Sequence, residues 1–345
     1  MISIGIIGGS GYTGKKLLEY CSYHPFVSDF KVYGNSTAGS SIFTVFPELA
    51  RIIDDFKIES VKNTSDEHDL YFIALPHGEA LNYVPALIEK GKKVIDLGGD
   101  YRLDDANVYE MWYKLAHNSA NLLNKKLYGL ADYPGTDYSG VQLIANPGCY
   151  PTATLLGILP LLNLGNNEII VAGTAAYSGT SGAGKTAKSE MLMSEMHGNV
   201  RAYNVNNHRH QPEILQVMNK LGFTAPFAFT THLLPVSNGI YATTTVHLKN
   251  SVNEEEINSI YNNIYSNSYF VRMRPVPPNL NWVTGTNFCD INVSAKDKTI
   301  VITSTIDNLI KGASGQAVQN MNRLYNWDEK LGLISNKGEK NVSVY

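Results

Sequence analysis

Short apolar runs that end at glycine or proline recur along the first 150 residues. The first run, Ile2–Ile7, stops at Gly8. Four comparable runs follow, at 30–33, 70–75, 93–97 and 142–145. Continuous apolar runs of this length are typical of strands buried on both faces of a parallel sheet. Segments with helical spacing separate them, so the sequence predicts an α/β domain with helices on both faces of the sheet.

The pattern changes after a helix that is expected to begin near Tyr150. Longer runs, in which apolar and polar residues partly alternate, lie at 168–176, 224–232, 241–248, 288–293 and 299–306. Such runs suit an antiparallel or mixed sheet with one covered face. A last helix is predicted over about 315–325, followed by a polar tail after Leu333. The sequence therefore predicts two closely packed domains.

Composition narrows the class of protein. A chain of 345 residues with 43% hydrophobic and 17% charged residues is ordinary for a globular protein of two domains. The net charge of −3 gives no electrostatic reason to expect nucleic acid or an anionic membrane as partner. No apolar stretch approaches the roughly 20 residues that span a bilayer, and the apolar start is too short for a signal peptide. Three cysteines do not form a disulfide framework, so we expect a cytoplasmic protein.

A glycine loop follows the first predicted strand and precedes a helix. It has the pattern G-x-x-G-x-x-G and reads Gly8-Gly9-Ser10-Gly11-Tyr12-Thr13-Gly14. Glycines permit the tight turn and let backbone N–H groups approach a pyrophosphate, to which the helix presents its positive end. A turn without ligand is the alternative, but the strand before and the helix after favour dinucleotide binding.

The end of the second predicted strand indicates which dinucleotide. Proteins that bind NAD usually place Asp or Glu there, and its carboxylate accepts hydrogen bonds from the ribose hydroxyls. This chain has Asn35, Ser36 and Thr37 instead. Because no carboxylate would repel a 2′-phosphate and hydroxyls could bind it, the sequence favours NADP.

A cysteine lies where a helix is expected to begin. Cys149 follows Asn146-Pro147-Gly148, directly after a predicted strand. A thiol at a helix N-terminus is expected to have a lowered pKa, and its thiolate is a nucleophile. For an isolated cysteine, a small buried side chain would be the better interpretation, and the Asn-Pro-Gly turn makes the two interpretations about equal. Cys21 and Cys289 fall within a helix and a strand, where a structural role is expected.

A nucleophilic thiolate needs a group that manages its proton. The segment from His208 to Glu213 supplies two histidines, His208 and His210, together with Arg209 and a carboxylate. Metal binding is a rival interpretation, but the sequence contains neither C-x-x-C nor H-E-x-x-H, so no metal site is expected.

The phosphate-binding pattern G-x-x-x-x-G-K-[ST] of nucleoside triphosphatases also occurs, from Gly179 to Thr186. Against that function, residues 173–178 separate the loop from its strand if the strand ends at Ala172. No downstream apolar run ends in an Asp that could hold magnesium, and the first glycine loop is better placed. A non-catalytic dinucleotide sensor is a third possibility, which would need neither Cys149 nor His210.

Together these segments resemble the N-acetyl-gamma-glutamyl-phosphate reductase family, almost from end to end. The matching segments in the first half are 8–14, 36–39, 97–102 and 146–153. Those in the second half are 178–184, 208–214, 285–290 and 307–322. The resemblance implies a Rossmann-like NADP-binding domain formed by residues 1–149 and 308–345. It also implies a central α+β catalytic and dimerisation domain, 150–307, of the semialdehyde and glyceraldehyde-phosphate dehydrogenase type.

The resemblance assigns roles to individual residues. Cys149 would be the nucleophile, and His210, with His208 as second choice, the general acid and base. Residues of the glycine loop, with Ser36, would bind NADP(H), as would Ser181, Gly182, Asn308, Gly312 and Gln316. The substrate, a small acyl phosphate, would contact Ser178, Arg209 and Glu213. The implied reaction is NADPH-dependent reduction of N-acetylglutamyl phosphate through a cysteine thioester, in a homodimer or homotetramer.

Three positions depart from the family's pattern. Asn35 stands where the family often has an arginine suited to a 2′-phosphate, which leaves NAD open as cofactor. Asn238 stands where an arginine often precedes Gly239, which leaves open an N-succinyl or a carrier-bound aminoadipyl substrate. Lys185 stands where arginine is common, so the charge is kept and the forked geometry is lost.

Overall fold

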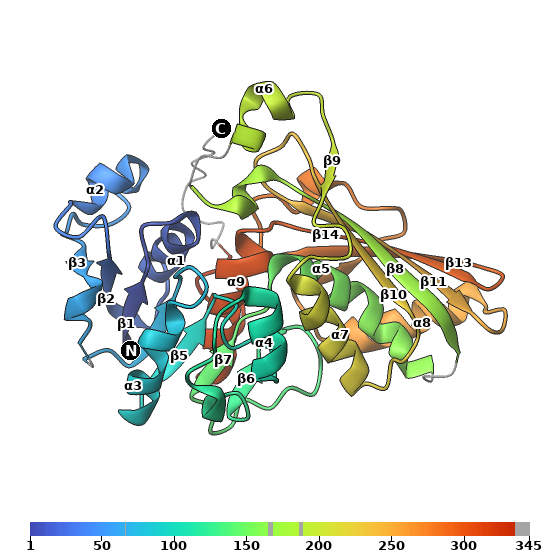
Figure 1. Cartoon of the computed structure of the whole chain (residues 1–345), viewed down its shortest axis with the longest axis horizontal. Coiled ribbons are helices and arrows are strands. Elements are labelled where there is room, and N and C mark those ends of the chain that lie inside the picture. The colour runs from blue at the N-terminus through green and yellow to red at the C-terminus, as the bar shows by residue number, and fades with distance from the viewer. Residues whose placement is uncertain (66, 165–167, 186–188, 335–345) are drawn as a thin grey trace.

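The computed structural model describes residues 1–65, 67–164, 168–185 and 189–334. The predicted tail beyond 334, and Thr186 of the Gly-Lys-Thr pattern, lie outside these residues. The described chain forms two sheets side by side, each accompanied by helices (Figure 1). Within the described residues, no helix has both the length and the apolar character needed to cross a membrane.

The first sheet is parallel throughout, as predicted. Its seven strands have the order β3-β2-β1-β4-β5-β7-β6, and every adjacent pair is parallel. The strands are β1 (Ile2–Ile7), β2 (Val27–Gly34), β3 (Glu59–Ser60), β4 (Leu70–Ile73), β5 (Lys93–Asp96), β6 (Lys126–Tyr128) and β7 (Leu143–Ala145). The sequence pattern missed β3 and β6, which have only two and three residues.

Helices cover both faces of this sheet, and one of them comes from the end of the chain. They are α1 (Tyr12–Ser22), α2 (Ile42–Val45), α3 (Val84–Glu89), α4 (Ala106–Tyr113) and α9 (Gly315–Leu324). Val318 and Met321 of α9 are fully buried in the same apolar core as Ile4 of β1 and Leu18 of α1. The last helix therefore packs on the first sheet, while the boundaries at 149/150 and 307/308 stay predictions.

The second sheet is mixed, and most of its strands are longer than those of the first sheet. Its order is β12-β13-β14-β11-β8-β10-β9, with β8/β10 and β12/β13 parallel and the other pairs antiparallel. The strands are β8 (Ile169–Ser178), β9 (Arg201–Tyr203), β10 (Phe227–Leu233), β11 (Ile240–Leu248), β12 (Val271–Met273), β13 (Cys289–Lys296) and β14 (Thr299–Ile306). The alternation predicted the five long strands and missed β9 and β12, which have three residues each.

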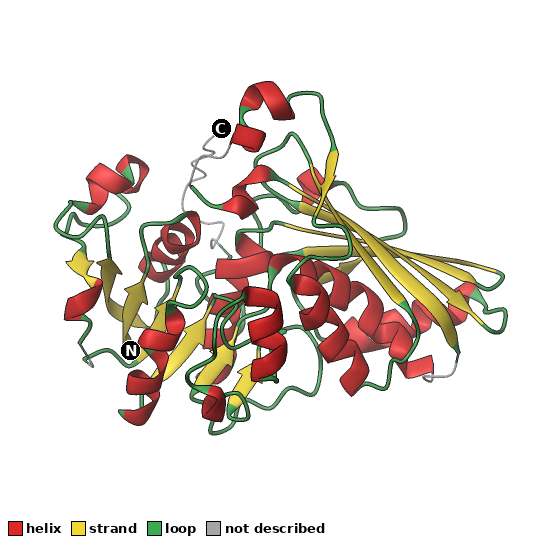
Figure 2. Ribbon diagram, viewed as in Figure 1, coloured by secondary structure: helices red, strands yellow, loops and turns green. Residues whose placement is uncertain are grey.

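Three helices lie along one face of the second sheet (Figure 2). They are α5 (Cys149–Ile158), α7 (His210–Lys220) and α8 (Glu254–Tyr265), and the short α6 (Met193–Met196) lies apart from them. Each of the three long helices contributes to the apolar core with β11 and β14, for example through Leu155, Ile214 and Tyr261. Residues 150–158 of α5 are all buried, so this helix is enclosed on every side.

The chain crosses between the two sheets twice, and both crossings meet. The outward crossing runs from β7 into α5, and the return crossing runs from β14 through a π-helical turn, Ile310–Ser314, into α9. A Cβ atom added to Gly312 in that turn would lie 2.7 Å from Cβ of Cys149. The start of α5 is therefore held at the junction of the two domains.

Candidate active site

The glycine loop has the geometry that its sequence predicts. Gly8 has φ +84°, and a Cβ atom there would lie 2.5 Å from the Ala74 carbonyl oxygen. A Cβ atom on Gly14 would lie 2.3 Å from the Gly9 carbonyl oxygen. The left-handed conformation and the close approach of loop and helix thus both require glycine.

The N-terminus of α1 is open to a ligand. The N-cap residue is Gly11, so no side chain binds the first N–H groups of the helix, and the first turn contains no acidic residue. Apart from its neighbours in the chain, no described residue has an atom within 4 Å of the place that a Gly11 Cβ atom would take. The first N–H groups of a helix have no partner within it and carry partial positive charge, so this end fits a dinucleotide pyrophosphate.

The segment after β2 lies beside this loop. The Gly8 N–H donates to the Tyr33 carbonyl at 2.8 Å, and the register pairs Ile7 with Tyr33. Asn35 and Ser36 follow directly and are exposed. The predicted cofactor residues of the glycine loop and of the β2 end are therefore brought together at one edge of the sheet.

Cys149 is the first residue of α5, as predicted, with Gly148 as its N-cap. Its side chain is partly buried, whereas Cys21 and Cys289 are buried in the two domains. The structure contradicts the predicted lowering of the pKa of this thiol. Burial raises the pKa of the Cys149 thiol, and Arg102 together with the Tyr150 N–H opposes that rise only in part. Desolvation of the thiolate therefore outweighs the helix terminus.

A buried ion pair lies behind the nucleophile. Glu213 is fully buried; its Oε1 accepts hydrogen bonds from the Gly148 N–H and the Tyr128 hydroxyl, both at 2.8 Å. Its Oε2 lies 3.7 Å from Nη1 of Arg102. The geometry favours a role for Glu213 in positioning the residue before Cys149 over the predicted substrate contact.

Arg102 is the site residue that the sequence reasoning missed. Arg102 is 7% exposed, and its guanidinium donates to the carbonyl oxygens of Asn146, at 2.9 Å, and Leu97, at 2.8 Å. Nη1 lies 3.4 Å from Nε2 of His210. Arg102 thus holds the strand ends on which the site is built, and the only sequence signal for it was its place in the resembling segment 97–102.

His210 faces the nucleophile's neighbour. A Cβ atom on Gly148 would lie 2.6 Å from His210 Nε2, so the imidazole lies against this glycine. Because a guanidinium can only donate, its approach to Nε2 assigns the ring proton of the neutral imidazole to Nδ1. Nδ1 has no hydrogen-bond partner among the described residues. Burial and the nearby charges of His208 and Arg102 lower the pKa of His210 well below its usual value.

His208 lies beside His210, with the centres of the two rings 4.8 Å apart. Its Nδ1 accepts the His210 backbone N–H at 3.2 Å, and its ring packs edge-on against Tyr150. Burial and the charge of Arg209 lower the pKa of His208 to about 4. Arg209 itself is exposed, in keeping with its predicted contact to substrate, which stays a prediction.

The return crossing brings further predicted residues to the site. Asn308 is 2% exposed; its Oδ1 accepts the Gly239 N–H at 2.6 Å and its Nδ2 donates to Ser181 Oγ at 3.0 Å. Gly182 lies near both Asn308 and Ser178, which is buried. Asn308 therefore joins the loop after β8 to the end of β14.

Gln316 is less accessible than the prediction implied. It is fully buried, and its amide binds the Thr152 hydroxyl at 2.9 Å and the Ala131 N–H at 3.3 Å. These contacts fix α9 to α5. The geometry favours a positioning role, and direct contact of Gln316 with the cofactor stays a prediction.

The loop that carries the Gly-Lys-Thr pattern requires a correction. β8 runs to Ser178, so the loop from Gly179 does follow its strand directly, and that objection to a triphosphatase was wrong. A triphosphate-binding loop leads into a helix whose N–H groups bind the phosphates. Here a short 3-10 turn, Thr180–Ala183, follows, and the next described helical segments have only three and four residues.

A cleft of about 460 Å³ lies between α1 and this loop. It is lined from the first domain by Tyr12, Lys15, Lys16 and Leu309, and from the second by residues that include Ser181, Lys185 and Asn238. The cleft extends from the glycine loop's helix to the residue after Asn308. It is therefore in the right place for a ligand that contacts both domains.

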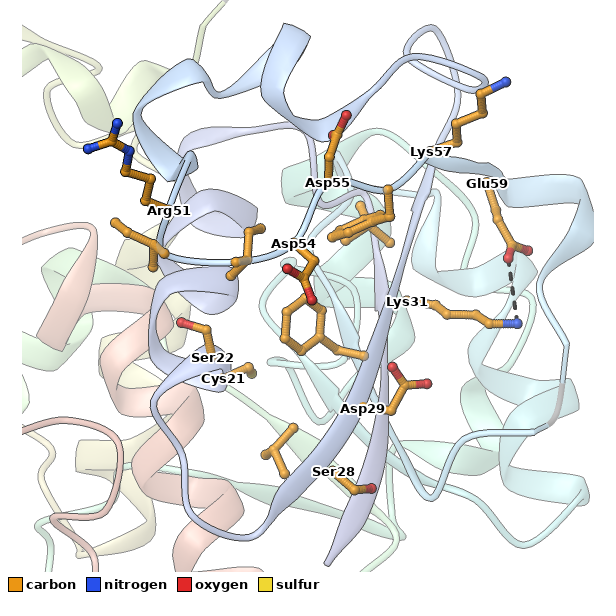
Figure 3. A pocket seen from close by; sticks show the side chains of 16 residues that line it. Cys21, Ser22, Ser28, Asp29, Lys31, Arg51, Asp54, Asp55, Lys57 and Glu59 are labelled. Atoms are coloured by element: carbon orange, nitrogen blue, oxygen red, sulfur yellow. Dashed lines mark ion pairs between the residues drawn. The ribbon is translucent and has the colours of Figure 1, made fainter.

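A larger cavity, of about 670 Å³, is lined by the end of α1, by β2 and by residues 51–57 (Figure 3). Charges of both signs line it, among them Asp29 and Lys31 of β2 and Asp54 of the segment opposite. Lys31 pairs with Glu59 at 3.5 Å. Its lining contains none of the predicted site residues, so we assign no part of the chemistry to it.

Two known families match this chain, one over most of the segment that forms the first sheet and the other over the segment that forms the second sheet. Residues 3–132 match the family described as semialdehyde dehydrogenase, NAD binding domain. Residues 149–308 match the family described as semialdehyde dehydrogenase, dimerisation domain. The predicted fold class, an NAD(P)-binding Rossmann domain with a mixed-sheet dimerisation domain, is confirmed.

Individual relatives match nearly the whole chain. The N-acetyl-gamma-glutamyl-phosphate reductase of Bacillus cytotoxicus is 40% identical over 344 residues, covering 96% of this chain and 98% of that protein. The enzyme of the same name from a Geobacillus species is 41% identical over 343 residues, with the same coverage.

Solved structures share the fold at much lower identity. Aspartate semialdehyde dehydrogenase II from Vibrio cholerae has a TM-score of 0.72 at 14% identity, over 94% of this chain and 98% of its own. The enzyme from Candida albicans, solved with NADP, has a TM-score of 0.65 at 15% identity, over 94% and 99%.

Proposed function

The chain belongs to the N-acetyl-gamma-glutamyl-phosphate reductase family, and we propose that Cys149 and His210 carry out that reductase chemistry in it. The reaction reduces N-acetyl-L-glutamyl 5-phosphate to N-acetyl-L-glutamate 5-semialdehyde and releases phosphate, a step of arginine biosynthesis. The observation that supports the assignment is the start of α5, where Gly148 lies against His210 and the adjacent Cys149 lies against Gly312 of the return crossing.

The first half of the reaction forms a thioester. The thiol of Cys149 attacks the acyl carbon as its proton passes to the neutral imidazole of His210, and the C–O bond to phosphate breaks. Because burial keeps the free thiol protonated and the imidazole neutral, the proton moves during attack and no stable ion pair precedes it. Arg102 faces Nε2 of His210 and Glu213, and so holds the ring against Gly148.

The second half of the reaction releases the aldehyde. NADPH, when bound, supplies the hydride that reduces the thioester carbonyl. His210, now protonated, gives its proton to the oxygen as that oxygen gains charge. It then takes the hydroxyl proton back as the C–S bond breaks, the semialdehyde leaves, and the proton returns to the Cys149 sulfur.

The residues near the glycine loop fit NADP(H), the cofactor of this family. Gly11 and Tyr12 would meet the pyrophosphate at the uncapped N-terminus of α1, and Ser36 the ribose. Gly312 borders the nucleophile, and it would meet the nicotinamide end together with Asn308, which precedes it on the return crossing. We further propose that the enzyme is cytoplasmic. We also propose that it forms a homodimer or homotetramer, and the match to a dimerisation domain supports this oligomeric state.

The reverse reaction tests the proposal most directly. Enzyme, NADP and N-acetylglutamate semialdehyde are mixed with and without phosphate, and nicotinamide reduction is followed by absorbance. We expect reduction that requires phosphate and is lost in Cys149→Ala, while that variant still binds NADPH. Appreciable activity in Cys149→Ala would exclude the thioester mechanism. Reduction only with an N-succinyl or carrier-bound semialdehyde would replace the substrate and keep the chemistry.

A further inference from the structure

Lys185 of the second domain reaches across the cleft to the glycine loop. Its Nζ donates to the Ser10 carbonyl oxygen at 3.1 Å, although the two residues are 175 positions apart. The ammonium also lies 4.2 Å from the centre of the Phe46 ring and 5.6 Å from that of Tyr12. Lys185 is the lysine of the Gly-Lys-Thr pattern, for which the reductase chemistry provides no use.

The charge of Lys185 is not neutralised by a neighbouring carboxylate. Glu48 is close enough to influence it electrostatically, but Glu48 forms its ion pair with Lys15. Among the described residues, no carboxylate oxygen lies within ion-pairing distance of Lys185 Nζ. Burial lowers the pKa of Lys185 even though Glu48 acts to raise it. An anion at this position would therefore gain from an unpaired ammonium.

The two segments that Lys185 touches flank the ribose end of a dinucleotide site. Ser10 belongs to the loop after β1, and Phe46 to the segment that continues from the end of β2. β1 and β2 are parallel neighbours, and the Gly8 N–H binds the Tyr33 carbonyl, so these loops lie side by side. In this fold the residue after the second strand is where NAD and NADP are distinguished. Asn35 supplies no charge there.

We propose that Lys185 recognises the 2′-phosphate of NADP(H), so that the second domain provides the cation that Asn35 does not. The inference rests on the proposed function, because it requires a dinucleotide in the cleft. A phosphate monoester carries close to two negative charges at neutral pH, and a lysine ammonium binds it as a point charge on a flexible stem. The ammonium would exchange its hydrogen bond with the neutral Ser10 carbonyl for one with a phosphate oxygen.

Binding measurements with a pair of variants test this proposal. Dissociation constants of NADPH, NADH, 2′,5′-ADP and 5′-AMP are measured by titration for the wild-type protein, Lys185→Met and Lys185→Arg. We expect Lys185→Met to weaken NADPH and 2′,5′-ADP by about 10- to 100-fold, the range for a hydrogen bond to a charged group, and to leave NADH and 5′-AMP unchanged. Lys185→Arg should stay within about threefold of wild type, because the charge is kept.

The matched control is Lys16→Met. Lys16 lines the same cleft, but its ammonium pairs with Glu19 at 2.6 Å, so its loss should not discriminate between the two dinucleotides. Equal weakening of NADPH and NADH by Lys185→Met would overturn the proposal and place Lys185 at the pyrophosphate. Unchanged binding of both would make Lys185 only a contact between domains. If the wild-type protein binds neither dinucleotide, the proposed function itself fails.

Discussion

Removing Arg102 should destabilise the protein severely. In Arg102→Met the volume is roughly kept, but the buried carboxylate of Glu213 loses its cation 3.7 Å away. The carbonyl oxygens of Leu97 and Asn146 lose donors at 2.8 and 2.9 Å. Breaking a buried ion pair by deleting one partner costs about 3–5 kcal/mol, because the other charge stays buried and uncompensated. For a domain of this size that corresponds to a fall in Tm of about 6–20 °C.

Thermal unfolding of four proteins is the assay: wild type, Arg102→Met, Glu213→Gln and the double variant. The double variant has no unpaired buried charge, so its loss should be smaller than the sum of the single losses by about 1–3 kcal/mol. A loss under about 1 kcal/mol in Arg102→Met, or strict additivity of the two single losses, would refute the reasoning that these groups form a coupled pair.

The pH dependence of Arg102→Met gives the same answer independently. Burial raises the pKa of Glu213 even in the wild-type protein, where Arg102 opposes the rise. Without Arg102 the folded-state pKa moves further above the unfolded value of about 4.3. The folded state then binds more protons than the unfolded state, so stability falls as pH rises from the unfolded pKa through the folded one. The deficit relative to wild type should be smallest near pH 4–5 and should lose this dependence in the double variant.

Three further predictions concern the nucleophile and its partners. Gly148→Ala should lower kcat by about 10- to 100-fold with NADPH affinity retained, because the new Cβ atom would displace His210, 2.6 Å away; unchanged kcat would contradict this placement. His210→Asn should lower kcat by about 10²–10⁴-fold and His208→Asn by less than about tenfold, because the hydrogen bond of His208 is to the backbone N–H of His210 and not to its imidazole; the reverse order would exchange their roles. Alkylation of Cys149 by iodoacetamide, followed by mass spectrometry, should still accelerate above pH 9, because burial raises its pKa; a plateau below pH 8 would contradict that direction.

The long elements were predictable from the sequence because each carries its own pattern. Apolar runs such as Ile2–Ile7 match the observed strand end to end, and alternation predicted β11 and β14 closely. Strands of two or three residues, such as β6 and β9, carry too few positions for any period to be visible. They form because neighbouring strands are already in place, so their existence depends on tertiary contacts that no local window contains.

The candidate site was predictable only where one segment contains the chemistry. The glycine loop, Cys149 and His210 each lie in such a segment. Arg102 could not be assigned from pattern, because its partner Glu213 lies 111 positions away and both become buried only when α7 packs beside α5. The same burial reversed the predicted pKa shift of Cys149. A helix terminus can be read from sequence, whereas desolvation depends on the whole surrounding fold.

The two chain crossings have a consequence for how the enzyme can move. Both lie beside Cys149, since the outward crossing ends at that residue and Gly312 of the return crossing touches it. Two adjacent connecting segments define an axis about which one domain can rotate against the other. Atoms on such an axis are displaced least by the rotation. The far hairpin of β13 and β14 would swing widely while the sulfur stayed nearly still (Figure 1). A rotation about this junction would open or close the cleft beside α1 while the Cys149 sulfur kept its place.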